Sequence, residues 1–296
     1  MITRFDHAVI AVGNLDEAIE SYSALGFEVF PGGRHDHRGT HNALIRFSGV
    51  DYIELLGVYD AEKAIQSGLN GRTLAEFTRD RAGGLAGHCY ATDDIEADAA
   101  RTRESGLEMV GPFEMQRARP DGKALTWRLL VPEDIPWRRR WPFIIEWDAP
   151  DEERLAVEGV GEHRNGSSSV SGVSITVRDL EEAVDLYSTL FDSEPTGRDE
   201  IDSLAAAGAS FDIHGFTIEL LSPIDDGPIR EALERDGEGP FEVRVVVADL
   251  ESTTKFLTDA DIETEEDDRI HGLRVSARDA LGARVVFAET AGTRRR

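Results

Sequence analysis

The chain has 296 residues, 40% of them hydrophobic, which suits about two domains of roughly 150 residues each. A net charge of −26, from 58 acidic and 32 basic residues, argues against nucleic acids and anionic membranes as partners. The single cysteine, Cys89, excludes an intrachain disulfide, and the absence of signal-peptide features or of an apolar run of about 20 residues predicts a cytoplasmic protein that does not enter the membrane.

The acidic residues are scattered through the whole chain and do not form a tail. Only Lys63, Lys123 and Lys255 among the basic residues are lysines. This pattern favours adaptation of the surface to high salt over an acidic surface that binds one partner.

The first predicted elements are a strand over residues 5–12 and a helix that starts after Asn14. Asn14 has N-cap chemistry, Glu17 follows at the spacing of a capping box, and Gly26 is placed to end the helix. Three strands are predicted next, around residues 28–30, 43–47 and 52–58. The buried face of the helix is predicted from apolar residues at helical spacing: Leu15, Ala18, Ile19, Tyr22 and Leu25.

Similar modules follow along the chain. The second begins with a strand near residues 87–92 and ends in a strand within residues 141–147. The third repeats the first without a gap at an offset of 165 residues; the clearest matches are Tyr22 with Tyr187, Leu25 with Leu190 and Glu54 with Glu219. The fourth runs from a strand over residues 241–247 to another near 284–287. Between the halves, residues 151–169 have the composition of a linker.

Four modules of this kind resemble the vicinal oxygen chelate superfamily, which includes glyoxalase I and the extradiol dioxygenases. The N-terminal half is similar in more detail to its glyoxalase-like members, in the stretches Phe5-Asp6-His7, Leu25-Gly26-Phe27, Gly39-Thr40-His41-Asn42, Tyr52-Ile53-Glu54-Leu55, Arg119-Pro120-Asp121-Gly122, Trp127-Arg128 and Pro142-Phe143-Ile144-Ile145-Glu146-Trp147. The resemblance implies an α+β fold of four βαβββ modules in two pairs, each pair forming a curved mixed sheet around a cleft. It gives a glyoxalase-like domain over residues 1–150, a linker over 151–169 and a degenerate domain over 170–296.

The resemblance also implies a divalent metal ion, such as zinc, nickel, iron or manganese, held by His7, Glu54, His88 and Glu146, although some relatives bind none. Glu54 and Glu146 are the predicted catalytic groups. Both lie inside apolar runs, where a buried carboxylate needs a cation or a hydrogen-bond donor beside it. A buried ion pair in a fold that has lost its metal is the competing interpretation.

His88 has an ambiguous register. His7 lies eight residues before Leu15 at the start of its helix, whereas Gly87, and not His88, lies eight residues before Ile95. A slip of one residue in a strand turns a side chain to the other face. His88 is therefore expected in the site only if the loop after its strand is one residue shorter.

Substrate-binding candidates come from the same two modules: His41, Asn42, Arg117, Arg119, Trp127 and Arg128. Arginine can hold a carboxylate or phosphate through two hydrogen bonds, but in so acidic a chain it also serves as an ion-pair partner. The tryptophan has core packing as its alternative role. His35 and His37 are predicted to lie in a solvated loop.

These observations predict a metal-dependent enzyme, a glyoxalase-like lyase or isomerase, that acts on a small oxygenated organic molecule as a monomer or homodimer. A metal-free binding protein of the bleomycin-resistance type and an extradiol-type dioxygenase are the alternatives. The C-terminal half has Gly172 and Glu242 at the positions that correspond to His7, so a metal is not expected there. That half is expected to be structural, to mimic a dimer partner or to form a second ligand cleft.

Overall fold

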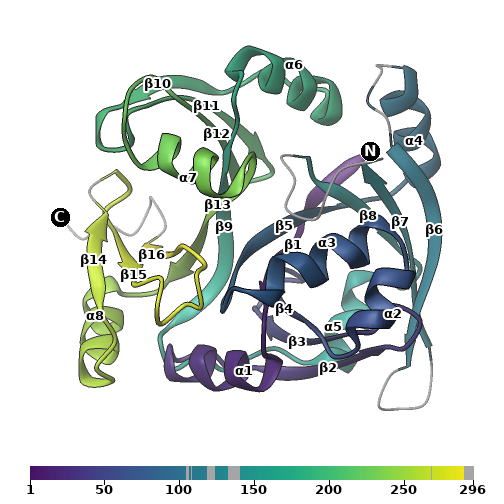
Figure 1. The fold of residues 1–296 in the computed structure, drawn as a ribbon, viewed down its shortest axis with the longest axis horizontal. Helices are drawn as coiled ribbons and strands as arrows, with labels where there is room; N and C mark the ends of the chain where they lie inside the picture. Colours follow the sequence, from purple (N-terminus) through teal and green to yellow (C-terminus); the bar gives the residue numbers. More distant parts are fainter. Residues whose placement is uncertain (105–106, 108, 119–123, 133–140, 268, 290–296) are drawn as a thin grey trace. The chain divides into compact units, whose positions relative to one another are not determined.

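A computed structural model describes residues 1–104, 107, 109–118, 124–132, 141–267 and 269–289 (Figure 1). Its strands form two mixed sheets of eight strands each, in the orders β2-β3-β4-β1-β5-β8-β7-β6 and β10-β11-β12-β9-β13-β16-β15-β14. In each sheet the strand order of one βαβββ module is followed by the reverse order of the next, so the first strands of the two modules are adjacent at the centre. The predicted α+β class and its four modules are confirmed.

The first sheet and its helices come from the N-terminal half: β1 (Ile2–Val12), α1 (Leu15–Ala24), β2 (Phe30–His35), β3 (Thr40–Arg46), β4 (Tyr52–Val58), α2 (Ala61–Gln66), α3 (Leu69–Arg79), β5 (Gly83–Thr92), α4 (Ile95–Glu104), β6 (Met109–Ala118), β7 (Ala124–Pro132) and β8 (Phe143–Trp147).

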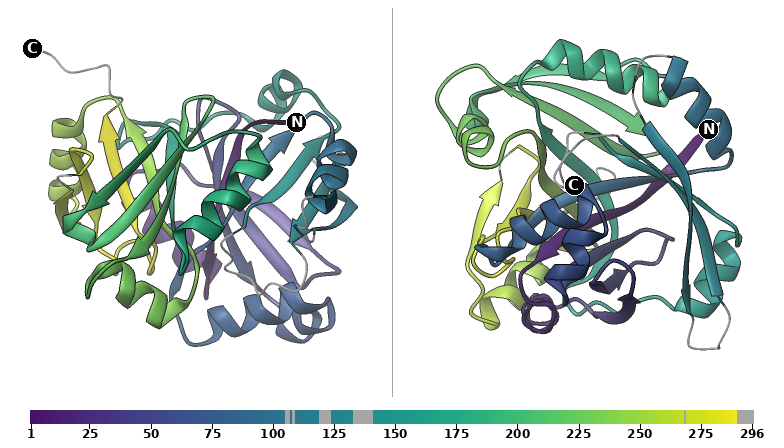
Figure 2. Two further views of the ribbon diagram at one scale, coloured as in Figure 1. Left: turned by 90° about the horizontal axis from the view of Figure 1, so that it is seen from above. Right: turned by 45° about the vertical axis from the view of Figure 1, so that its right-hand side comes forward.

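A short helix and the second sheet follow: α5 (Asp151–Glu158), β9 (Ser167–Thr176), α6 (Leu180–Phe191), β10 (Gly197–Ile201), the 3-10 turn η1 (Asp202–Leu204), β11 (Ala206–Ile213), β12 (Phe216–Pro223), α7 (Pro228–Asp236), β13 (Gly239–Val247), α8 (Leu250–Asp259), β14 (Thr264–Asp267), β15 (Gly272–Val275) and β16 (Val285–Glu289). In this part of the chain α6 packs on β11 and β12, as Figure 2 shows.

The helix starts follow from short-range hydrogen bonds that the sequence predicts. The Asn14 side chain accepts from the backbone N–H groups of Asp16 and Glu17, and Asp179 accepts from that of Glu182. Gly26 ends the first helix with a φ of 91°, a conformation that glycine adopts without strain. The predicted caps of both helices are confirmed.

Two local predictions differ from the structure. The strand expected at residues 28–30 starts only at Phe30 and extends to His35, because it pairs with β3 in a hairpin. His35 therefore lies on a strand, where its Nδ1 is 2.9 Å from Thr40 Oγ1, whereas His37 is exposed in the turn as predicted. The segment predicted as a linker contains α5 and the first residues of β9.

Contacts group the chain into two compact units. The first unit comprises Met1–His7, Ala86–Pro150 and Gly172–Phe241, and the second comprises Ala8–Leu85, Asp151–Ser171 and Glu242–Arg296. The boundaries of the two domains and the linker, at residues 150 and 170, remain a prediction. None of the helices among the described residues is both long and apolar enough to span a membrane.

Candidate functional site

His7 lies on β1 in the first unit, with only 4% of its surface exposed. Its Nδ1 is 2.7 Å from Oδ1 of the neighbouring Asp6. Because an ionised carboxylate can only accept, His7 Nδ1–H is the donor in this pair. The ring also packs edge-on against Phe143, at 5.3 Å between centroids. The ring of His7 is thus fixed by one hydrogen bond and one aromatic contact.

Asp6 is completely buried, and its charge is compensated by other donors besides His7. Its Oδ2 accepts from Nη1 of Arg4 over 2.8 Å and from Nε1 of Trp147 over 2.9 Å. A buried carboxylate is tolerated when it is paired and hydrogen-bonded in this way. Asp6 is therefore held in place from β1 and from β8.

Cys89 on β5 completes a group of three potential metal ligands. One ligand atom from each of Asp6, His7 and Cys89 lies within 4.8 Å of the other two, and all three residues are buried. Tetrahedral ligands at about 2.0–2.3 Å from one ion lie about 3.3–3.8 Å apart, so the three side chains would have to draw together to share an ion. Oxygen, nitrogen and sulfur donors together suit zinc or another first-row transition metal. The residues fit a divalent ion.

The face of the sheet around Cys89 is apolar and aromatic. Residues paired across neighbouring strands point to the same face, and successive residues on a strand point to opposite faces. Cys89 pairs with Phe143, Ala91 with Ile145, and Trp127 with Trp147. The two tryptophan rings lie 5.2 Å apart. The side chains that pack together on this face are Cys89, Ala91, Ile145, Trp127, Leu129, Phe143 and Trp147.

His88 lies on the opposite face of β5 from Cys89, because it is the next residue along the strand. It is fully buried there, with Nε2 at 3.4 Å from the hydroxyl of Tyr187 and its ring edge-on to Tyr90. The structure therefore does not bring His88 together with His7 and Cys89. His88 lies seven residues before Ile95, and the structure corresponds to the alternative in which this register turns its side chain away from the predicted site.

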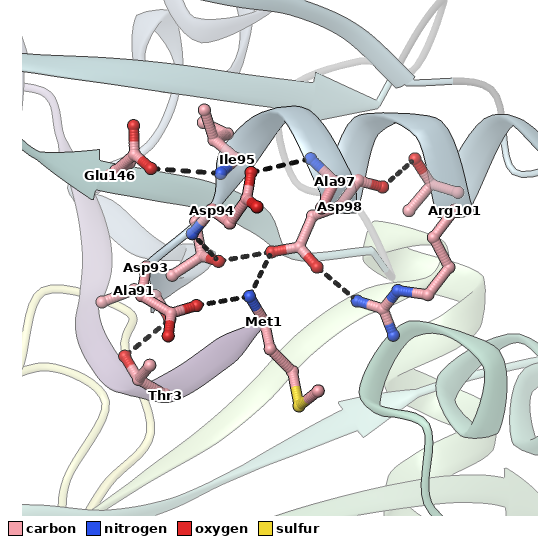
Figure 3. Close-up of polar contacts among 12 residues, drawn as sticks. Met1, Thr3, Ala91, Asp93, Asp94, Ile95, Ala97, Asp98, Arg101 and Glu146 are labelled. Atoms are coloured by element: carbon pink, nitrogen blue, oxygen red, sulfur yellow. Dashed lines mark hydrogen bonds and ion pairs between the residues drawn. The ribbon is translucent and has the colours of Figure 1, made fainter.

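Glu146 lies on the same face as His88, because its neighbour Ile145 packs with Cys89. Figure 3 shows its Oε1 accepting from the backbone N–H of Ile95 at the start of α4, over 3.2 Å. Its Oε2 accepts from Nε of Arg128 over 2.8 Å and also from Nη2. The hydrogen bond to Glu146 raises the pKa of Arg128. Arg128 and the N-terminus of α4 are therefore the hydrogen-bond donors that a carboxylate in this apolar run requires.

Arg128 makes a second ion pair, with Glu96 at 2.9 Å, so among the described residues its contacts are those of a structural ion-pair partner. Of the other substrate-binding candidates in this module, Arg117 lies on β6 opposite Leu125, and Arg119 falls outside the described residues. Trp127 is half-buried on the face of Cys89.

Glu54 lies in the second unit, on β4. Asn42 and Glu54 share one face of the β3–β4 pair, and Asn42 Nδ2 donates to Glu54 Oε1 over 2.6 Å. Oδ1 of Asn42 is buried and has no hydrogen-bond partner among the described residues. Burial lowers the pKa of the Arg38 guanidinium, and the nearby charge of Glu54 opposes that shift. Asn42, Glu54 and Arg38 thus form a second polar group.

His41 occupies the other face of β3, opposite Gly57 and next to Leu15 of α1. Burial lowers its pKa, and the positive charge of Arg34 lowers it further, against the effect of Asp16. Among the described residues, His41 therefore does not join Asn42 and Glu54 on their face.

Three residues of these groups escape sequence reasoning: Asp6, Cys89 and Arg38. A signal for Cys89 does exist, because it lies two residues after Gly87, the position eight residues before Ile95, and so shares the face of that position. Asp6 is adjacent to His7, and alternation along the strand argues against placing them together. Arg38 stands in a polar, glycine-flanked run that reads as a loop.

The chain matches the glyoxalase-like domain family over residues 5–191, more than half of its length. Its fold is similar to that of a hypothetical protein from Staphylococcus aureus, with a TM-score of 0.69 and 19% identity over 96% of this chain and 98% of the other. It is also similar to a mutant of 4-hydroxymandelate synthase from Streptomyces coelicolor, with a TM-score of 0.63 and 14% identity over 100% of this chain and 94% of the other. A search of the curated proteins finds no match. At these identities the two structures establish the fold alone.

Proposed function

Since the chain belongs to the glyoxalase-like domain family, and so to the vicinal oxygen chelate superfamily, we propose that it is a divalent-metal-dependent lyase or isomerase of a small oxygenated organic substrate. The observation that carries this proposal is the buried group of Asp6, His7 and Cys89, whose ligand atoms lie within 4.8 Å of one another. This set keeps His7 from the sequence prediction. It does not include the other three predicted ligands, Glu54, His88 and Glu146; His88 and Glu146 lie on the other face of their strands.

Asp6, His7 and Cys89 would hold the ion, which when bound supplies a positive charge that polarises a carbonyl oxygen of the substrate. Cys89 would bind as the thiolate, because the thiolate is the form of cysteine that ligates metals. Binding the ion would therefore release a proton, and ion affinity would fall as the pH falls.

The surrounding residues act by positioning. Arg4 and Trp147 hold the Asp6 carboxylate through hydrogen bonds of 2.8 and 2.9 Å, and Asp6 and Phe143 in turn fix the ring of His7. The aromatic side chains beside Cys89 lower the polarity of this face, which strengthens electrostatic interactions there. A substrate with an apolar or aromatic part would pack on the same side chains.

Glu54 and Glu146 are the groups that the sequence predicts to transfer a proton. Both carboxylate oxygens of Glu146 accept hydrogen bonds, one from the N-terminus of α4 and the other from Arg128. Glu54 is oriented by Asn42, and its charge raises the pKa of the nearby, half-buried Arg38 against the effect of burial.

Metal analysis tests the proposal. Protein purified without added metal or chelator should contain about one equivalent of a transition metal by elemental mass spectrometry. His7→Ala and Cys89→Ser should lose the metal, because each removes a ligand, whereas His214→Ala, which changes an exposed histidine, should retain it. Absence of metal from the wild type, with no uptake on soaking, would overturn the proposal.

A metal-free binding protein is the second candidate. The full set of donors around Asp6 favours it, because Arg4, Trp147 and His7 already satisfy this carboxylate in the absence of an ion. Trp127 and Trp147 would report on a ligand through their fluorescence. Saturable quenching by an aromatic ligand that persists after chelation, without turnover, would support this candidate.

An iron-dependent dioxygenase needs two histidines and a carboxylate with open coordination positions. His88, the natural second histidine, faces Tyr187 on the opposite side of β5 from Cys89. This geometry disfavours the dioxygenase. The metal analysis also tests the dioxygenase, since iron as the bound metal would make it the leading candidate function.

A further inference from the structure

We propose that the C-terminal half carries a second ligand site, which binds the oxyanion group of a small carboxylate or phosphate compound through Arg244, Arg269 and Arg284. These arginines surround Glu242 on β13, which is completely buried. Glu242 lies eight residues before Leu250 at the start of α8, the position that His7 holds in the first module. The fourth module therefore has a charged group where the first module has its metal ligand.

The contacts to Glu242 are close. Nη2 of Arg269 donates to both of its carboxylate oxygens, over 2.9 and 2.8 Å, and Nε of Arg284 donates to Oε2 over 2.8 Å. Nε of Arg244 lies 3.9 Å from Oε1. Three guanidinium groups thus converge on one carboxylate.

Asp267, at the end of β14, holds Arg269 from its other side. Its Oδ1 accepts from Arg269 Nε over 3.1 Å and its Oδ2 from Nη2 over 2.8 Å. Burial opposes ionisation of Asp267, but the hydrogen bonds and the charge of Arg269 outweigh burial and lower its pKa. Arg269 is therefore rigidly placed, which reduces the entropy lost when a ligand binds to it.

Among the residues of this group that the structure describes, positive charge exceeds negative charge. Arg244, Arg269 and Arg284 carry three positive charges, whereas Glu242 and Asp267 carry two negative ones. The adjacent pair of Arg274 and Glu265 adds no net charge. Burial and the neighbouring Arg274 and Arg269 lower the pKa of Arg284, against the effect of Glu242. An added oxyanion would relieve this repulsion between arginines.

The register brings the arginines to one face. Val243 pairs with Val285 and Arg244 with Val286, so Glu242, Arg244 and Arg284 point to the same side of the β13–β16 pair. The arginine side chains remain partly exposed to solvent: Arg244 and Arg269 are each 11% exposed, and Arg284 is 22% exposed. Guanidinium groups that are partly desolvated and held side by side suit bidentate recognition of carboxylate or phosphate.

A purely structural ion-pair network is the competing account, and binding measurements separate the two. Inorganic phosphate and oxalate would be titrated by calorimetry into the full-length protein, with ionic strength held constant by potassium chloride. We expect saturable binding of at least one of the two, with a dissociation constant in the millimolar range or below. The anion that binds more tightly identifies the phosphate or the carboxylate class.

Arg244→Gln should weaken binding at least tenfold, because Arg244 is the arginine least engaged with Glu242 and its loss leaves the other hydrogen bonds intact. Arg278→Gln is the matched control, since Arg278 is 69% exposed and pairs with Asp279, and it should bind like the wild type. Arg244→Lys keeps the charge and should retain part of the affinity if Arg244→Gln fails to fold. No saturable binding to the wild type, or affinity unchanged in Arg244→Gln and Arg244→Lys, would overturn the proposal. His7→Ala, which removes the proposed metal ligand, should leave anion binding unchanged.

Discussion

Replacement of Asp6 by asparagine tests how the candidate metal site is held. Asparagine has almost the same shape but no charge, and its side chain offers one acceptor oxygen where the carboxylate has two. The described donors around Asp6 belong to Arg4, Trp147 and His7, so the amide nitrogen must face at least one of them. The variant therefore loses both a charge pair and a buried hydrogen bond.

The cost follows from the burial of the group. A buried donor without an acceptor costs about 1–3 kcal/mol. Breaking a fully buried ion pair costs about 3–5 kcal/mol, but Arg4 is 21% exposed and can turn towards water, which reduces that contribution. Together these effects predict that Asp6→Asn lowers the free energy of unfolding by about 2–4 kcal/mol.

Urea unfolding with chelator present is the assay, because it removes any contribution from a bound ion. Asp199→Asn, at an exposed position on β10, is the matched control and should change stability by less than about 0.5 kcal/mol. A change for Asp6→Asn within the range of the control would refute the account of Asp6. With metal in place of chelator, the difference between wild type and Asp6→Asn should grow, since only the wild type keeps the charged ligand.

Three further outcomes are expected. Glu54→Gln should slow isomerisation of a 2-oxoaldehyde–thiol adduct by about 100-fold or more, whereas Glu219→Gln, at the corresponding position of the third module, should not. Equal rates for Glu54→Gln and the wild type would exclude Glu54 as the base. Burial lowers the pKa of His163 below 6.5, and its Nδ1 accepts from the backbone N–H of Glu28. The contribution of neutral His163 to stability is therefore complete above pH 6.5 and is lost as the pH falls through the pKa that His163 has in the folded state. His163→Gln should therefore flatten the loss of stability between about pH 7 and pH 5, in contrast to His214→Gln, and parallel pH profiles for wild type and His163→Gln would contradict this. The net charge of −26 predicts that the thermal midpoint rises from about 0.1 M to about 2 M potassium chloride, and a falling midpoint would argue against mutual repulsion of the surface carboxylates.

Local rules predict the module boundaries well. Asn14 and Asp179 cap their helices as their side chains indicate, and Tyr22 and Tyr187, related by the 165-residue offset, are both fully buried. These features depend on residues within a few positions of each other or on repetition. Both can be read from a single sequence.

The assignment of side chains to faces is harder to predict. Alternation shows that Glu146 and Trp147 point to opposite faces but does not say which face carries the site. The answer depends on pairing with β5 and β7, which are distant in sequence. For the same reason, sequence reasoning favours Glu146 as a ligand and overlooks Cys89.

Long-range ion pairs are the least predictable part of the chain. Glu242, Arg269 and Arg284 are separated by up to 42 residues and meet only through the register of β13 and β16. Arginine is abundant in this sequence, so no single arginine stands out as the partner of a buried carboxylate. Arg38 near Glu54 illustrates the same limit within a shorter stretch.

Cobalt substitution tests most directly whether Cys89 and His7 hold one ion. Metal-depleted protein would be titrated with Co²⁺ and followed by absorption spectroscopy. We expect one equivalent to bind with a near-ultraviolet thiolate-to-cobalt charge-transfer band, which Cys89→Ser should abolish and His7→Ala should weaken together with affinity. Cobalt binding without that band in the wild type, or no binding, would contradict a metal centre built on Asp6, His7 and Cys89.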